Sequence, residues 1–220
     1  MSDQAGGGDG GTSPPPQGAP LVPAKKYSSS FNGTEVKTLV GCGVYPVNYS
    51  AKSGAAGAGT EGPKLSEADA EAAEAAGGFV DIVDEALYYF KARMMMKTFP
   101  VEGAADRLSL WLTLYLQNCM RRLSKQPQPL SQAQAWAALQ TLASERQTVP
   151  GDASYPFNGM YPKPVPAEHE ALRDYAKQLR LEAGYRLVQR VYAHPSADGG
   201  PNKFWMPFAK ADLLGHMMEK

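Results

Sequence analysis

The chain has 220 residues, with 22 lysines and arginines against 22 aspartates and glutamates, so its formal net charge is zero. A neutral chain lacks the excess of cations that binding to nucleic acid or to an anionic membrane surface requires, although a local basic patch is compatible with a neutral total. The longest dense apolar run, residues 108–116, is less than half of the ~20 residues that a membrane span needs, so no membrane span is expected.

The first part of the chain predicts little regular structure. Residues 1–24 are rich in glycine and proline and are predicted to form a disordered tail, because such a segment cannot offset its ordering entropy by burial. Residues 25–78 are predicted to be an extended, partly buried arm followed by an Ala/Gly-rich linker. Ser66 and Asp69 form a weak capping box in that linker, where a short helix is an alternative to the favoured flexible segment.

A helical domain is predicted over residues 79–218, and its first helix over about 79–97. One apolar stripe at i, i+3, i+4 spacing defines that helix, as expected for a helix with one buried face. Its members are Phe79, Ile82, Val83, Ala86, Leu87, Phe90 and Met94. Met95 and Met96 lie outside the stripe and are therefore candidates for contact with another protein.

The second predicted helix, over about 104–124, is apolar on every side in the run from Leu108 to Leu116. A helix of this kind must be covered on all sides. The sequence therefore predicts an all-α fold of about five helices, in which this central helix is surrounded by the others.

The remaining helices are predicted from caps and periodicity. Ser131 and Gln134 form a capping box for a helix to about residue 145, and Pro166 suits the first turn of a long helix to about residue 193. Asn202 is predicted to cap a final helix that contains Phe204 and Trp205. The proline-rich segment 149–166 contains apolar rings that either pack on the body as a strap or form an exposed contact patch.

No catalytic constellation is evident. Asp81, Asp84 and Glu85 begin the first predicted helix, where a solvated helix start explains them without acid–base chemistry. The three histidines and two cysteines have no metal-ligand spacing, and the cysteines form no paired motif, which favours a reducing compartment. We therefore expect no catalytic residue, no metal and no cofactor.

Several ordered segments of the chain together resemble one known protein family. The upstream segments are Asp81-Ile-Val-Asp-Glu-Ala-Leu-Tyr-Tyr-Phe-Lys91, Glu102 with Ala105-Asp106-Arg107, and Leu112-Thr-Leu-Tyr-Leu116 with Cys119. The downstream ones are Tyr161 with Lys163-Pro164, Gln178-Leu-Arg180, Glu182, Gly184, Arg186-Leu187, and Lys203 with Trp205. Together these segments resemble subunit 3 of the actin-related protein 2/3 complex, the 21-kDa subunit family. The resemblance extends from about residue 27 to about residue 218. It is loose in the arm and poor over 125–150, while residues 1–24 and 51–78 depart from it.

The resemblance implies an all-α, non-catalytic structural subunit of a seven-subunit assembly that nucleates branched actin filaments in the cytoplasm and cytoskeleton. It implies binding to actin-related protein 3 and the other subunits, support of actin-related protein 2 in the active arrangement, and a place beside the actin filament at the branch. Without it, a free-standing helical adaptor or a small intracellular helical enzyme remains open. Exposed aromatic rings anchor interfaces, so we expect partner contacts at Tyr155, Phe157, Tyr161, Pro164, Lys203 and Trp205.

Overall fold

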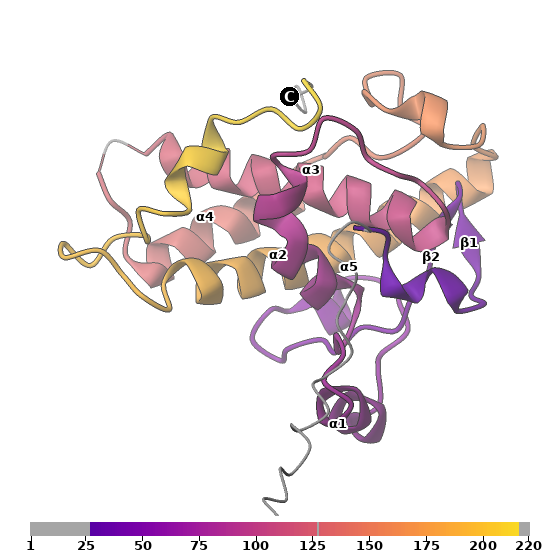
Figure 1. Cartoon of the computed structure of the whole chain (residues 1–220), viewed down its shortest axis with the longest axis horizontal. Coiled ribbons are helices and arrows are strands. Elements are labelled where there is room, and N and C mark those ends of the chain that lie inside the picture. The colour runs from indigo at the N-terminus through magenta and orange to yellow at the C-terminus, as the bar shows by residue number, and fades with distance from the viewer. Residues whose placement is uncertain (1–26, 127, 216–220) are drawn as a thin grey trace, which may run out of the picture.

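The structure is a computed structural model that describes residues 27–126 and 128–215. The predicted tail, 1–24, lies outside these residues, as does the end of the predicted helical domain, 216–218. Four helices form the body of the molecule, and a shorter one, α1, stands away from it (Figure 1). Their bounds are α1 Glu67–Ala75, α2 Ile82–Arg93, α3 Ala104–Ser124, α4 Gln132–Ser144 and α5 Pro166–Val191.

Helix α3 is the centre of the fold. It contacts α2, α4, α5, the strand β2 (Cys42–Gly43) and two 3-10 turns, η1 (Ser30–Gly33) and η4 (Met206–Ala209). Every residue from Leu108 to Gln117 is buried, and the rings of Trp111 and Tyr115 stack with their centroids 6.1 Å apart. Burying each large apolar side chain contributes about 1.5–3 kcal/mol. The predicted all-α fold with a covered central helix over 104–124 is confirmed.

The predictions for α4 and α5 are also confirmed. The Ser131 hydroxyl accepts from the backbone N–H of Gln134, and the Gln134 side chain accepts from the N–H of Ser131. Helix α5 begins at Pro166 and continues through Gly184, which faces Leu139 of α4. The two helices run antiparallel, since Trp136 contacts Tyr185 while the Arg180 guanidinium donates to the carbonyl of Ala143.

Three segments differ from the sequence-based predictions. The first predicted helix is shorter than 79–97, because Asp81 caps it and it ends at Arg93. Where a flexible linker was favoured, alanine-rich α1 forms behind its Ser66 cap. The predicted final helix is wrong: only the turn η4 forms, because side chains of α3 bond the carbonyls of Ala209 and Ala211 that a helix would use for its own backbone bonds.

The arm upstream of α1 is extended and packs against the body. Its strands β1 (Thr38–Leu39) and β2 form a two-residue hairpin. Both turn residues, Val40 and Gly41, have positive φ (49° and 76°), as this tight turn requires. A side chain at Gly41 would also bring its Cβ within 2.6 Å of Pro162 Cδ, so the hairpin packs closely against the segment that precedes α5.

Candidate interaction surface

The start of α2 is a buried ionic site that joins three segments. Asp81 and Glu182 have fully buried side chains, and the guanidinium of Arg186 donates to both, with N···O distances of 2.6–2.9 Å. It also donates to the carbonyl of Asn48 in the arm. Burial alone would lower the pKa of Arg186, but the two carboxylates raise it above its ordinary value.

This geometry corrects the prediction of a solvated helix start. Asp81 and Glu85 are buried, and only Asp84 is half-exposed. Asp81 caps α2 by accepting from the backbone N–H groups of Val83 and Asp84. Asp81 and Glu85 therefore do not face solvent; they hold segments of the chain together.

A second buried network fastens residues 28–32 to the body. Asp106 of α3 accepts from the backbone N–H of Ser29 at 2.6 Å and from the side chain of Asn32 at 2.7 Å. Glu85 accepts from the backbone and hydroxyl of Ser30 and faces Arg93 at 3.4 Å. Burial lowers the pKa of the Arg93 guanidinium, although the charge of Glu85 opposes that shift. The polar residues at the start of α2 and α3 thus hold the chain in one shape.

The aromatic residues of segment 149–166 form a strap that packs on the body. Tyr155, Phe157 and Tyr161 are buried, and their rings meet edge to face with centroids 5.3 and 6.2 Å apart. The hydroxyl of Tyr155 donates to that of Tyr161, which donates to the carbonyl of Arg107 at the start of α3. Of the two arrangements open at the sequence level, the structure has the packed strap.

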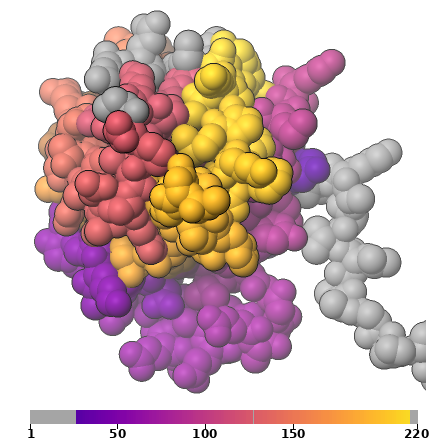
Figure 2. Space-filling view, turned by 90° about the vertical axis from the view of Figure 1, so that its left-hand side faces the viewer, coloured from indigo at the N-terminus to yellow at the C-terminus, as the bar shows by residue number. Residues whose placement is uncertain are grey.

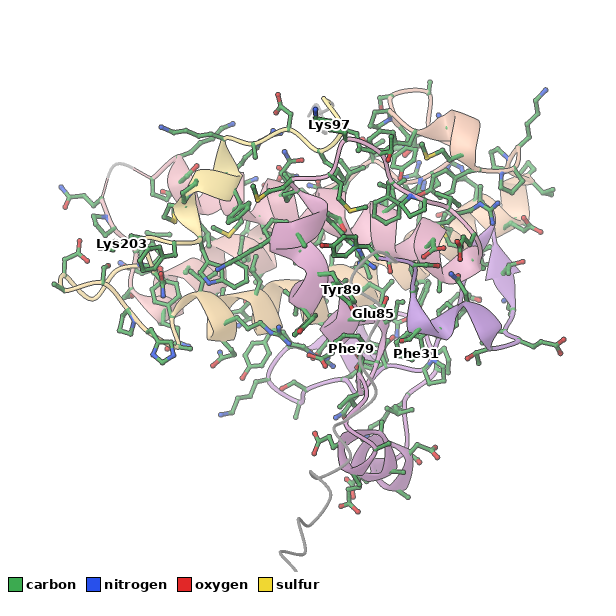
Figure 3. The ribbon with its side chains drawn as sticks, viewed as in Figure 1. Phe31, Phe79, Glu85, Tyr89, Lys97 and Lys203 are labelled. Atoms are coloured by element: carbon green, nitrogen blue, oxygen red, sulfur yellow. The ribbon has the colours of Figure 1, made fainter. Side chains whose placement is uncertain are left out.

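The other expected interface residues lie apart from the strap. Trp205 is buried and stacks on Phe90 of α2, with the Lys91 ammonium 4.2 Å from its ring centre. Pro164 is half-buried, and Lys203 is exposed (Figure 3). The strap contacts the start of α3 at Arg107, whereas the C-terminal segment contacts its end at Arg121, about 21 Å along the helix. The six residues therefore do not form one surface, and their role in partner binding stays a prediction.

An exposed apolar face on α2 was missed at the sequence level, except for Met95. Tyr88, in α2, is 64% exposed, and Met95, seven residues further on and just past the end of the helix, is 80% exposed. The ring of Tyr88 contacts those of Phe79 and Tyr89 with centroids 5.0–5.2 Å apart. Figure 3 shows Phe79 and Tyr89 together beside α2. We call Phe79, Tyr88, Tyr89 and Met95 the α2 face. The sequence feature that could have predicted this face is Tyr88, an aromatic residue that lies outside the i, i+3, i+4 spacing of the buried stripe.

The described residues contain no cluster of metal-ligating side chains and no exposed thiol. Among residues 27–126 and 128–215, no three histidines, cysteines, aspartates or glutamates lie close enough together to hold a metal ion. Cys42 and Cys119 are both buried, and burial raises the pKa of each thiol to about 12. No helix in the same residues has the length and apolar character to cross a bilayer.

A family model and relatives from distant organisms all match the chain to the same protein family. The model of the P21-Arc family, the ARP2/3 complex ARPC3 (21 kDa) subunit, matches residues 24–218. Actin-related protein 2/3 complex subunit 3 of Dictyostelium discoideum is 40% identical over 136 residues, which cover 61% of this chain and 75% of that protein. The Arabidopsis thaliana protein of the same name is 33% identical over 190 residues, covering 86% of this chain and 96% of the relative. The chain therefore belongs to the family of the 21-kDa ARPC3 subunit of the ARP2/3 complex.

Proposed function

We propose that the chain is a non-catalytic structural subunit of the actin-related protein 2/3 complex that supports nucleation of branched filaments. In this proposal it binds actin-related protein 3 and the other subunits, and supports actin-related protein 2 in the active state beside the actin filament at the branch. The observation that carries the proposal is the family match over residues 24–218, which includes the whole helical body.

The use of polar residues in the interior agrees with a structural role. Asp81, Glu85, Asp106 and Glu182 bond to backbone or to arginine and serve to hold the arm and the helices in one arrangement. A subunit that positions other proteins gains from such rigidity, because the ordering entropy is lost before binding rather than during it. The small helical enzyme, by contrast, would need reactive groups around a pocket.

We propose that the α2 face is one of its contact surfaces. Tyrosine, phenylalanine and methionine are enriched where proteins meet. Tyr88 in α2 and Met95 just after it are both large apolar side chains that are mostly exposed. The ring contacts of Tyr88 with Phe79 and Tyr89 hold it in place, so little side-chain entropy remains to be lost on binding. The strap and Lys203 stay as predicted contacts at the two ends of α3.

Co-purification tests both parts of the proposal. A tagged full-length chain, expressed in cells that lack their own subunit 3, is expected to recover the six other subunits and to restore branched actin assembly. The double variant Tyr88→Ala/Met95→Ala is expected to recover less of the complex. Its matched control is Met160→Ala/Val165→Ala, which removes exposed apolar side chains from the strap end.

The outcomes separate the two surfaces. Loss with the control variant alone would favour the strap and refute the α2 face as a contact. Recovery of the wild-type chain by itself, with no other subunit, would refute the proposed function and would favour a free-standing adaptor.

A further inference from the structure

The described chain begins at the edge of the α2 face. The ring of Tyr27, its first residue, meets the ring of Tyr89 edge to face, with the centroids 5.9 Å apart. Figure 2 shows the indigo start of the described chain at the surface, next to magenta residues of the segment that contains α2. The 26 residues upstream of Tyr27 therefore join the body beside the aromatic rings of this face.

The residues just upstream of the described chain have the composition of a polyproline II ligand. Residues 14–23 include five prolines, and the last two, Pro20 and Pro23, flank the apolar pair Leu21 and Val22. A polyproline II helix is extended and has no internal hydrogen bonds, and proline-rich segments in this conformation bind grooves lined by aromatic rings. Such a segment loses little backbone entropy on binding, because proline fixes φ before contact.

The α2 face provides the groups that such a segment needs. The rings of Phe79, Tyr88 and Tyr89 lie 5.0–5.5 Å from one another, and Tyr88 is 64% exposed. None of the described residues forms a hydrogen bond with the hydroxyl of Tyr88 or of Tyr89. Both hydroxyls are therefore available to donate to the backbone carbonyls that a polyproline II helix leaves unpaired.

The distances between the segment and the face also agree. At 3.1 Å per residue, the four to seven residues that separate Pro23 and Pro20 from Tyr27 span about 12–22 Å in polyproline II. The ring contacts that lead from Tyr27 through Tyr89 to Tyr88 are 5.9 and 5.0 Å long. The two prolines therefore reach as far as Tyr88.

From these observations we propose that residues 20–26, the docking segment, lie on the α2 face of their own chain in the polyproline II conformation. Because the docking segment is tethered at Tyr27, its effective concentration at the face is on the order of 1 mM, so even a weak contact is occupied. A second copy of the chain, or another protein, would need to reach that concentration in solution.

The docking segment and a partner protein would exclude each other on the α2 face. This consequence rests on the proposed contact of that face with another subunit, and it makes the docking segment a built-in competitor of that contact. The docking itself does not rest on the contact, because it is measured in the isolated full-length chain. The docking and the proposed function can therefore fail separately.

Fluorescence anisotropy of the full-length chain, labelled just upstream of the docking segment, tests the proposal. The substitution Ala19→Cys provides one thiol for the fluorophore, whereas the native thiols of Cys42 and Cys119 are buried. The variant Tyr88→Ser removes the most exposed ring of the α2 face. Its matched control, Phe204→Ser, removes a ring that is 68% exposed in the turn before η4. Circular dichroism verifies that both variants fold.

A second pair of variants tests the polyproline II conformation. Pro20→Gly/Pro23→Gly loosens the docking segment, because glycine restores the freedom of φ that proline removes. Pro14→Gly/Pro16→Gly makes the same change about 34–40 Å upstream of Tyr27, which is farther than the ring contacts of the face extend.

We expect Tyr88→Ser and Pro20→Gly/Pro23→Gly each to lower the anisotropy at least about halfway to its value in urea, and the two controls to lower it by less than about a tenth of that difference. A wild-type anisotropy no higher than that of Tyr88→Ser would mean that the face is open to another protein, and it would overturn the proposal. Equal losses in variants and controls would place the segment elsewhere and refute it. A wild-type anisotropy that falls on dilution would assign the segment to a second copy, which would also refute docking within one chain.

Discussion

Replacement of Arg186 by alanine tests the buried ionic site at the start of α2. The guanidinium donates to Asp81 at 2.7 and 2.9 Å, to Glu182 at 2.6 Å and to the carbonyl of Asn48 at 2.7 Å. Its removal leaves two fully buried carboxylates without their cation. Breaking a buried pair in this way costs about 3–5 kcal/mol. Because 19% of the Arg186 side chain is exposed and water can partly replace it, we expect about 3 kcal/mol.

The matched control is Arg190→Ala, one turn further along α5. Arg190 pairs with Asp84 of the same helix α2, but both side chains are about one-third exposed. Such a pair contributes less than about 1 kcal/mol. Urea unfolding of the purified chains at pH 7, followed by tryptophan fluorescence, gives both free energies of unfolding. If the two variants lose the same stability within about 0.5 kcal/mol, burial does not decide the strength of these pairs and the reasoning fails.

Three further predictions concern the helix contact and the titratable groups. Gly184→Ala should stabilise the chain by about 0.5–1 kcal/mol in the same urea assay, because the new Cβ would lie at ordinary contact distances of 3.6–3.8 Å from its neighbours and alanine favours the helix. A loss of stability would show that α4 and α5 leave no room for the added methyl group. The thiols of Cys42 and Cys119 should react slowly with a disulfide reagent at pH 8 and quickly in urea; rapid reaction in native buffer would contradict their burial. Stability should fall as pH rises from about 10 to about 12, because burial raises the pKa of Tyr45 to about 12 while the unfolded chain ionises this group near 10; constant stability across that range in alkaline urea titrations would refute it.

The helical body could be predicted because its signals are local. The all-apolar run of α3 and the capping box of α4 each lie within a few residues, and both give the observed bounds to within one residue. The buried stripe of α2 was also correct from Ile82 to Met94. In α2 and α3, the spacing of apolar residues that predicts the helix also identifies the side chains that the fold buries.

The burial of the rings among the expected interface residues could not be predicted, because burial of a loop depends on distant segments. Tyr161 is buried because its hydroxyl bonds the carbonyl of Arg107, 54 residues earlier in the chain. Trp205 is buried because Phe90 lies beneath it. No local pattern distinguishes these rings from exposed ones. The same is true of Asp81, whose burial depends on Arg186, 105 residues further on.

The attachment of the arm has a consequence for synthesis of the chain. The arm bonds to α5 at Tyr45 with Tyr175, at Ser50 with Glu182 and at Gly62 with Gln178, across 116–132 residues of sequence. A ribosome therefore releases the arm long before the helix that receives it has been translated. During that interval the apolar side chains of the arm lack the surface of α5 against which they pack in the native fold. The incomplete chain is therefore expected to bind chaperones. A nascent chain stalled before residue 175 should stay bound to chaperones. A nascent chain whose residues up to 186 have left the exit tunnel should be released from them.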